Sequence, residues 1–293
     1  MSSLAYEIVD VFTDRPFTGN PLAVVFGADG LAGEQMLALA REFNLSETVF
    51  VLAPSDSGSG ATYRARIFTP GTELPFAGHP SVGAAVTVTR RGLCGAGIVV
   101  QECGAGLLPI EVGGDGRARL TGGTPSIGAE LAAGPLLAAV GLAAEDAAAG
   151  PPPRSAGCGL DFTYLPVRPD AVARASLDWA AAARLGNPQL SVFAWDPQAR
   201  SAHARVFCPG VGVPEDPATG SAALGLGVWL VAGGLLAADG VTTYTVHQGG
   251  ELHRPSTLDC TVLAAGGAAV EATVAGGVVV IARGEIAIPP FVG

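Results

Sequence analysis

The sequence lacks the short motifs by which nucleotide-binding and metal-binding proteins are usually identified. No GxGxxG follows a predicted strand and GxxxxGK[ST] does not occur, so nucleotide binding has no support. The cysteines form an odd set without a CxxC pair, which argues against a disulfide framework and a zinc site. A reduced, cytoplasmic environment is therefore expected. The cysteines are Cys94, Cys103, Cys158, Cys208 and Cys260.

Charge is also scarce. Charged residues make up 14% of the chain and its net charge is −10 at pH 7, whereas a nucleic-acid surface needs clustered Lys and Arg. The opening run MSSLAYEIVDVF has neither the basic flank nor the apolar core of a secretory signal. Residues 217–238 carry no charge, but they are rich in Gly and have no basic flank, so we interpret them as a buried helix. Neither nucleic acid nor membrane is an expected partner.

An internal repeat is present instead. Residues from Arg64 read RARIFTPGTELPFAGHPSVGAA, and residues from Arg205 read RVFCPGVGVPEDPATGSAALG. Both copies contain an Arg, a β-branched residue and Phe, then Pro-Gly, a second Pro, and a Gly that leads into an Ala-rich run. The copies are separated by about 140 residues, close to half of the 293-residue chain. The repeat predicts two related halves, each with a strand, a turn and a helix that starts at Gly78 or Gly220.

The two predicted helix starts indicate a class of ligand. Free N–H groups and a positive dipole end at each start would attract an anion, so a small carboxylic acid bound in a cleft between the halves is expected. Two ordinary capped helices would show the same spacing. The length suits two medium domains, and we place the boundary between residues 122 and 123.

Hydrophobic periodicity predicts the remaining elements. In the first half we expect an amphipathic helix over residues 33–43 and strands at 6–12, 22–26, 48–52, 62–68, 98–101, 107–112 and 117–120. In the second half we expect helical stretches at 129–149, broken by Gly134-Pro135, and at 170–185. Strands are expected there at 162–167, 190–195, 202–207, 242–246, 258–263, 270–274 and 278–286. The pattern favours an α+β fold in which short strands curl around one apolar helix per half.

A few polar residues are candidates for chemistry. Glu47 stands where the first helix gives way to an apolar strand, so its carboxyl could be partly desolvated and suited to proton transfer, or simply exposed. His79 could polarise a substrate or cap its helix. Asp216 and Ser221 precede or open the second helix, where both are also common caps. The other histidines, His203, His247 and His253, are interpreted as structural, and Glu73 and Glu215 as solvent-side.

Long motifs in a fixed order resemble the PhzF-like family of phenazine-biosynthesis isomerases. They are VDVFTDRPFTGNPLAVVF, LAREFNLSETVFVL, RIFTPGTELPFAGHPSVGAA, VPEDPATGSAALG, HQG…RPS and VVVIARGEI, and they span essentially the whole chain. The sequence departs from the family at His253, where Gly is usual.

The resemblance implies a diaminopimelate epimerase-like fold of two pseudo-symmetric domains, each a mainly antiparallel sheet around a central helix. It implies domains at residues 1–122 and 123–277, with a C-terminal strand, 278–293, that returns to the first. It also implies a homodimer and neither a metal nor an organic cofactor. By this resemblance Glu47 moves the proton, while His79, Asp216 and Ser221, with Gly78 and Gly220, hold or polarise the substrate.

Related epimerases place a Cys at each helix start, whereas this chain has His79 and Ser221 there. The expected function is therefore an isomerase of a small, cyclic carboxylic acid that works by carbon proton transfer, like trans-2,3-dihydro-3-hydroxyanthranilate isomerase. The alternatives are a binding protein that has lost turnover, and an epimerase or racemase of a related acid.

Overall fold

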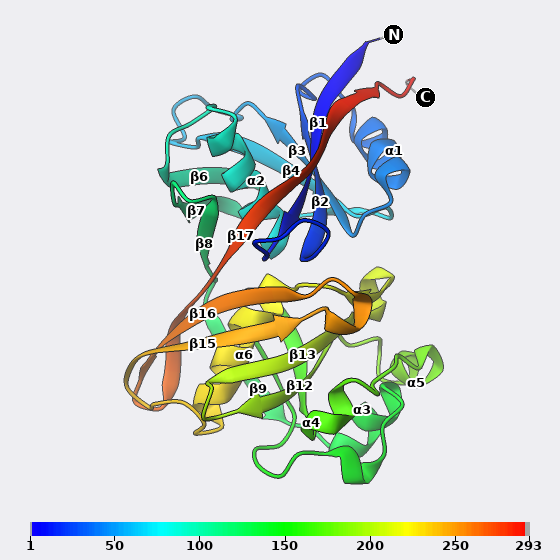
Figure 1. Ribbon diagram of the computed structural model, residues 1–293, viewed down its shortest axis with the longest axis vertical. Coiled ribbons are helices and arrows are strands. Elements are labelled where there is room, and N and C mark those ends of the chain that lie inside the picture. Colours follow the sequence, from blue (N-terminus) through cyan, green and yellow to red (C-terminus); the bar gives the residue numbers. More distant parts are fainter. Residues whose placement is uncertain (1, 291–293) are drawn as a thin grey trace. The chain divides into compact units, whose positions relative to one another are not determined.

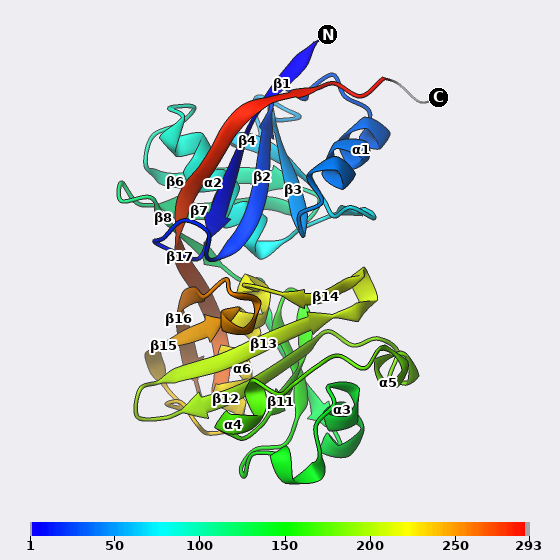
Figure 2. The same ribbon diagram turned by 45° about the vertical axis from the view of Figure 1, so that its right-hand side comes forward.

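The computed structural model describes residues 2–290. The chain divides into two compact units, which are shown in Figures 1 and 2. Unit 1 comprises Met1–Leu120 and Ala275–Gly293, and unit 2 comprises Thr121–Val274. Residues 291–293 of the predicted returning strand, and Met1, lie outside the described residues.

Unit 1 is a mixed sheet around one buried helix. Its elements are β1 (Ser3–Val11), β2 (Asn20–Phe26), α1 (Gly33–Phe43), β3 (Glu47–Leu52), β4 (Tyr63–Phe68), β5 (Glu73–Leu74), α2 (Gly78–Arg90), β6 (Gly97–Cys103), β7 (Gly106–Val112) and β8 (Arg117–Thr121). Strand β2 runs parallel to β3, β3 antiparallel to β4, and β4 parallel to β6. Helix α1 packs Met36, Leu39 and Ala40 into a separate small core with Phe50 and Phe68.

Unit 2 repeats this order of pairings. Its elements are β9 (Pro125–Glu130), α3 (Ala133–Ala139), η1 (Ala144–Asp146), β10 (Arg154–Cys158), β11 (Asp161–Pro166), α4 (Pro169–Val172), α5 (Trp179–Arg184), β12 (Leu190–Asp196), β13 (Ser201–Cys208), η2 (Pro209–Val211), β14 (Val213–Asp216), α6 (Gly220–Ala232), β15 (Gly240–Gln248), η3 (Gly250–Leu252) and β16 (Ser256–Ala265). Strand β11 runs parallel to β12, β12 antiparallel to β13, and β13 parallel to β15.

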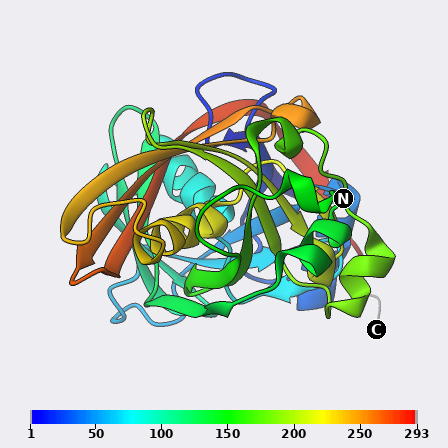
Figure 3. The same cartoon turned by 90° about the horizontal axis from the view of Figure 1, so that it is seen from below.

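The repeated segments are strand–turn–helix units. In each copy a short strand folds back antiparallel on the Arg-containing strand before the helix begins, β5 on β4 and β14 on β13. Helices α2 and α6 both have 13 residues, and both are buried along nearly their whole length. Figure 3 shows the strands of unit 2 curving around α6 (yellow). No helix within residues 2–290 is both long and apolar enough to span a membrane.

Glycine lets α2 and α6 approach their surrounding strands closely. A Cβ on Gly83 would lie 2.5 Å from Leu22 Cδ2, and one on Gly225 would lie 2.4 Å from the Tyr164 hydroxyl. Separations this short are not seen for real Cβ atoms, so a side chain at either position would require its neighbours to shift. The two glycines occupy the same position of their helices, the sixth residue.

Two predicted helical stretches of unit 2 are wrong in part. Residues 129–149 begin as the end of β9, which pairs with β10, and only Ala133–Ala139 is α-helical. Residues 170–185 form two short helices, α4 and α5. Between them the carbonyls of Val172, Ala173 and Ala175 accept from Arg205 Nη1, at 3.3, 3.2 and 2.5 Å, so these oxygens are engaged by a side chain where the helix would have continued.

The last two predicted strands are one strand, β17 (Ala268–Ala287). Residues 275–277 separate the two predicted strands, yet the backbone stays extended there. The carbonyl of Gly277 accepts from the amides of Phe12 and Thr13, at 2.8 and 3.3 Å. A Cβ on Gly276 would lie 2.4 Å from Phe12 Cδ1, so the glycines permit a close approach of backbones and not a turn. From Val278 onward, β17 pairs antiparallel with β1.

His253 follows η3 with φ of 56°, in the left-handed region that favours glycine. The position at which the sequence departs from the PhzF-like pattern is therefore one where Gly would be the unstrained choice.

Candidate active site

Glu47 is placed by the end of α1 and the start of β3. Asn44 ends the helix with φ of 50°, and three residues later Glu47 pairs with Leu22 of the parallel strand β2. Its side chain is 15% exposed, so the carboxyl is largely removed from water without being sealed. This agrees with the predicted partial desolvation of a group at a helix–strand junction.

His79 is the second residue of α2 and brings its ring to Glu47. Its Nε2 lies 3.6 Å from Glu47 Oε2, and its side chain is 5% exposed. The first turn of α2 and the first residue of β3 thus place the two predicted residues side by side within unit 1. Gly78, which starts the helix, is buried beside them.

Asn20, which sequence analysis did not single out, fixes the state of the histidine. Its Nδ2 lies 3.3 Å from His79 Nδ1 in a fully buried setting. An amide nitrogen has only hydrogens to offer, so Nδ1 accepts and the proton of a neutral ring is on Nε2, which faces Glu47. The signal that could have found Asn20 is its place in the quoted FTGNP run, where a polar side chain opens an apolar strand.

Burial keeps this imidazole uncharged. Desolvation lowers the pKa of His79 from 6.5 to about 3, because the charged ring would lose its hydration. Near neutral pH the ring therefore offers an N–H donor and no positive charge. A neutral donor beside a carboxylate leaves that carboxylate free to act as a base, whereas an imidazolium would hold it in an ion pair.

In unit 2, Asp216 ends β14 and is 8% exposed. Thr219 Oγ1 donates to its Oδ2 at 2.5 Å. Gln248, from the HQG motif, holds the same loop: its Nε2 donates to the Asp216 carbonyl at 2.6 Å, and its Oε1 accepts from the Thr219 amide at 3.1 Å. Ser256, from the RPS motif, donates to the Pro217 carbonyl at 3.1 Å. The quoted motifs after the second helix therefore support the loop that precedes it.

Ser221 stands in α6 where His79 stands in α2. It is the second residue of a helix that starts at Gly220, and it is 8% exposed. The predicted residues thus form two groups, one in each unit: Gly78, His79 and Glu47 in unit 1, and Asp216, Gly220 and Ser221 in unit 2.

The prediction that Glu215 is solvent-side is wrong. Its carboxylate accepts from Arg205 Nε at 2.8 Å and from Nη2 at 2.6 Å, and the side chain is 10% exposed. Glu73 makes the equivalent pair with Arg66 at 2.7 Å but is 42% exposed. Sequence analysis treated both carboxylates alike, since it could not show that the turn after α4 covers Arg205.

The cysteines lie away from both helix starts, in β6, β10, β13, β16 and the loop after α2. Burial raises the pKa of Cys158 to about 12, and it also raises the pKa of Cys260. Because the thiolate is the reactive form, these two buried thiols are unsuited to proton abstraction. Among the described residues, no group of three His, Cys, Asp or Glu side chains is arranged to hold a metal ion.

The chain is similar to proteins of one family along most of its length. The family model of phenazine biosynthesis-like proteins matches residues 9–284. The chain is 35% identical over 317 residues to an uncharacterised isomerase of Mesorhizobium japonicum, covering 98% of this chain and 99% of that protein. It is 36% identical over 234 residues to the trans-2,3-dihydro-3-hydroxyanthranilate isomerase of Pseudomonas aeruginosa, covering 77% of this chain and 79% of that protein.

Among solved structures, the fold is similar to that of a PhzF-family phenazine biosynthesis protein of Bacillus anthracis. The TM-score is 0.88 at 26% identity, and the match covers 98% of this chain and 100% of that one. The family match extends over both units and over all the quoted motifs except the last two residues of VVVIARGEI. The chain is an isomerase that belongs to the phenazine biosynthesis-like (PhzF) family.

Proposed function

We propose that this isomerase moves a proton between two carbon atoms of a small, cyclic carboxylic acid, with Glu47 as the general acid and base and without a cofactor. The observation that carries the proposal is the 3.6 Å approach of Glu47 Oε2 to a neutral, Asn20-bound His79. One carboxylate beside a neutral N–H donor and partly shielded from water suits such a transfer.

The proposed reaction conserves every atom of the substrate. The Glu47 carboxylate takes a proton from a substrate carbon, so a C–H bond breaks and a carboxyl O–H bond forms. The electron pair that is released shifts through an adjacent double bond to another carbon. That carbon then takes the proton back from Glu47, which regenerates the carboxylate.

His79 and the unit 2 residues serve as donors in this scheme. The Nε2–H of His79 stabilises negative charge that develops on a substrate oxygen, without giving up its own proton. We assign substrate binding to Asp216 and Ser221 in unit 2. We also assign a part in binding the anionic substrate to Gly78 at the start of α2 and to Gly220 at the start of α6, since backbone amides in the first turn of a helix attract anions. The Pseudomonas aeruginosa relative is named for a cyclic carboxylic acid, which supports that class of substrate.

The test is isotope exchange in D₂O. The protein is incubated with trans-2,3-dihydro-3-hydroxyanthranilate and with a panel of cyclohexene- and cyclohexadienecarboxylic acids, and ¹H NMR locates the deuterium. We expect deuterium at a different carbon from the one that loses its proton, together with a shifted double bond. Deuterium that appears only at the original carbon, with inversion, would support an epimerase instead. Binding of an acid with neither deuterium uptake nor a shifted double bond would support a protein that has lost turnover.

We also propose a diaminopimelate epimerase-like fold with two pseudo-symmetric domains, supported by the equal order of strand pairings in the two units. A homodimer is proposed from the family resemblance. Light scattering should then give twice the chain mass of 29.2 kDa at micromolar concentration, and a value equal to the chain mass would contradict it.

A further inference from the structure

Unit 1 contains a cavity at the end of α2 that is remote from Glu47. It has a volume of about 350 Å³, and the residues that matter here among those lining it are Phe26, Val51, Leu52, Val88, Arg91 and Cys94. His79 lies in the first turn of α2 and Arg91 directly after its last residue. Twelve residues of helix separate them, which is roughly 18 Å at about 1.5 Å per residue. The cavity is therefore distinct from the candidate active site.

A cluster of arginines gives one wall of this region a positive charge. Glu7 is 2% exposed, and three guanidinium groups converge on its carboxylate. Arg91 Nη1 and Arg283 Nε each lie 3.3 Å from Oε1, and Arg90 Nη2 donates to Oε2. Three cations around one anion leave a local excess of two positive charges, in a chain whose net charge is −10.

Arg91 connects this charge to the cavity. Its guanidinium lies over the ring of Phe26, 4.1 Å from the centroid, and both residues line the cavity. The side chain is 33% exposed, so it can be reached from solvent. A guanidinium has five N–H donors in a planar fork, and the contact with Glu7 leaves donors for a second carboxylate. Asp29, Thr62 and Tyr63 also line the cavity, and Asp29 Oδ1 accepts from the Ala53 amide at 2.8 Å, while the rest of the wall is mostly apolar.

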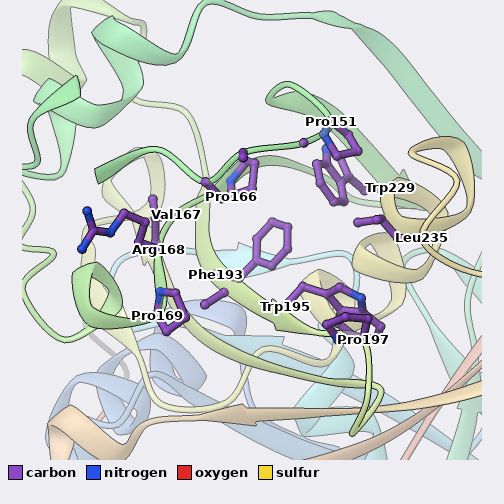
Figure 4. A pocket seen from close by; sticks show the side chains of 14 residues that line it. Pro151, Pro166, Val167, Arg168, Pro169, Phe193, Trp195, Pro197, Trp229 and Leu235 are labelled. Atoms are coloured by element: carbon purple, nitrogen blue, oxygen red, sulfur yellow. The ribbon is translucent and has the colours of Figure 1, made fainter. Parts of the chain in front are cut away.

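Unit 2 has a cavity at the corresponding end of α6, also about 350 Å³, but its chemistry differs (Figure 4). Trp195, Trp229 and several prolines line it. Arg168 at its edge pairs with Asp170 through two contacts of 3.1 and 3.3 Å, which cancels its charge. The fold thus forms a hollow at the end of each central helix. The one in unit 1 combines a mostly apolar wall, with Asp29 as its one acidic lining residue, and the arginine cluster around Glu7, of which Arg91 lines the cavity.

We propose that the unit 1 cavity is a second ligand site, which binds a small organic anion with an apolar body. The apolar part lies against Val51, Leu52 and Val88, and the carboxylate or other anionic group accepts from Arg91. The volume suits a ligand of about ten non-hydrogen atoms, at roughly 30 Å³ each as for liquid water. Excess positive charge on an acidic protein would also steer such anions to this face.

The test uses Cys94, which lines the cavity, as a local reporter, and octanoate as the probe. Alkylation by iodoacetamide is followed by mass spectrometry at Cys94 and at Cys103, a free and partly exposed cysteine outside the cavity lining. With octanoate at about four times its Kd, the rate at Cys94 should fall about fivefold by mass action, while Cys103 is unaffected. Octanol has the same chain without the charge. The octanol concentration that protects Cys94 equally well should therefore be at least about tenfold higher than that of octanoate.

Variants assign the effect to the arginine. Arg91→Gln should raise the octanoate concentration needed to protect Cys94 at least about tenfold, which is the usual effect of losing a charge-assisted hydrogen bond. Arg184→Gln, on α5 of unit 2, and Glu47→Gln should leave it unchanged. Tryptophan fluorescence should also stay constant, since Trp195 and Trp229 line the other cavity. Equal protection by octanol, equal protection of Cys103, or no protection at about 10 mM octanoate would each overturn the proposal. If Arg91→Gln does not fold, the comparison of octanoate with octanol in the wild type decides.

Discussion

The two units carry the same backbone framework but different side chains where their central helices begin. Helices α2 and α6 have equal length, the same glycine crossing, and an Arg–Glu pair on the strand that precedes each. The second helical residue, however, is His79 beside a carboxylate in unit 1, and Ser221 after a tightly hydrogen-bonded loop in unit 2. The repeat preserved the elements that shape each helix start. The second helical residue is a His beside a carboxylate in unit 1, whereas in unit 2 it is Ser221, and the buried carboxyl there is Asp216.

The Arg–Glu pairs show a second difference, in burial. Arg66 and Glu73 are 28% and 42% exposed, whereas Arg205 and Glu215 are 9% and 10% exposed. Arg205 also donates hydrogen bonds to three backbone carbonyls at the end of α4 and in the turn that follows. In unit 2 the same motif therefore holds neighbouring backbone in place. A repeated sequence therefore does not imply a repeated energetic role.

The largest expected effect is on the rate of isotope exchange, and it distinguishes Glu47 from Glu73 in the first copy of the repeat. Glu47→Gln keeps the size of the side chain but removes its basicity, so exchange of substrate protons with D₂O should slow about 10²–10⁴-fold. Substrate affinity should change far less, because the lost interaction acts mainly in the transition state. NMR exchange rates and a binding titration measure the two quantities.

Glu73→Gln is the matched control for that experiment and should leave the exchange rate near wild type. Asp216→Asn and Ser221→Ala should fall between the two, since they bind substrate and move no proton. The assignment of Glu47 is wrong if Glu47→Gln exchanges at the wild-type rate, or if a Cys substitution abolishes exchange while Glu47→Gln does not.

The next effect sharpens the contrast between the two arginines. Arg205→Met leaves Glu215 and three carbonyls without their partner in a buried setting, which should reduce the free energy of unfolding by about 3–5 kcal/mol. Arg66→Met removes a partly exposed pair and should cost about 0–1 kcal/mol. All three tryptophans are in unit 2, so fluorescence during urea unfolding reports Arg205→Met directly, and circular dichroism reports both variants. Equal losses for the two variants would contradict the difference in burial.

A smaller effect is expected at the glycine crossings. In Gly225→Ala the new methyl group meets the Tyr164 hydroxyl and also the backbone of Ala156 and Gly157, at 3.0 Å each. Since backbone cannot move aside, we expect a loss of about 1–3 kcal/mol in the free energy of unfolding. Gly83→Ala meets only the ends of side chains, of Leu22 and Val11 among the nearest atoms, and gains helix propensity, so its change should stay within about 1 kcal/mol. Urea unfolding followed by circular dichroism compares them, and a larger loss at Gly83 would refute the explanation.

Sequence analysis predicted the elements that carry their own local signal. The bounds of α1, the start of α2 and the strand–turn–helix form of both repeats follow from periodicity and from Gly and Pro positions. It failed where distant groups decide the structure. The alanine-rich residues 129–149 favour a helix locally, but pairing with β10 makes the first of them a strand. The break after α4 depends on Arg205, about thirty residues further along the chain.

The same distinction holds for the candidate site. Glu47 and His79 could be chosen from motifs, and the structure places them in contact. Asn20 could not, because its role arises only when β2 and α2 pack together and its amide meets His79 Nδ1. Gln248 and Ser256 likewise act through the Asp216–Thr219 loop, which no spacing in the sequence reveals.

The smallest predicted effect is a pH dependence that unit 2 cannot share at its helix start, since Ser221 does not titrate in this range. Burial lowers the pKa of His79 to about 3 in the folded protein, against 6.5 in the unfolded chain. Between these values the unfolded chain binds more protons, so this residue makes stability fall as the pH drops below about 6.5 and has little effect above it. The charged form would also face Glu47 from β3, whose negative charge would reduce the effect. Between pH 7.5 and pH 5.5 the loss of unfolding free energy due to His79 should be about 1 kcal/mol, at about 1.4 kcal/mol for each pH unit below the unfolded pKa.

His79→Gln removes the titrating ring, so the difference in unfolding free energy between the two pH values should shrink by that amount, whatever the variant's own stability. Urea unfolding followed by circular dichroism at both pH values measures it. The exposed His247→Gln is the control and should keep the wild-type difference. If His79→Gln keeps it as well, the ring is not held neutral by burial, and its proposed role as an uncharged donor beside Glu47 loses its physical basis.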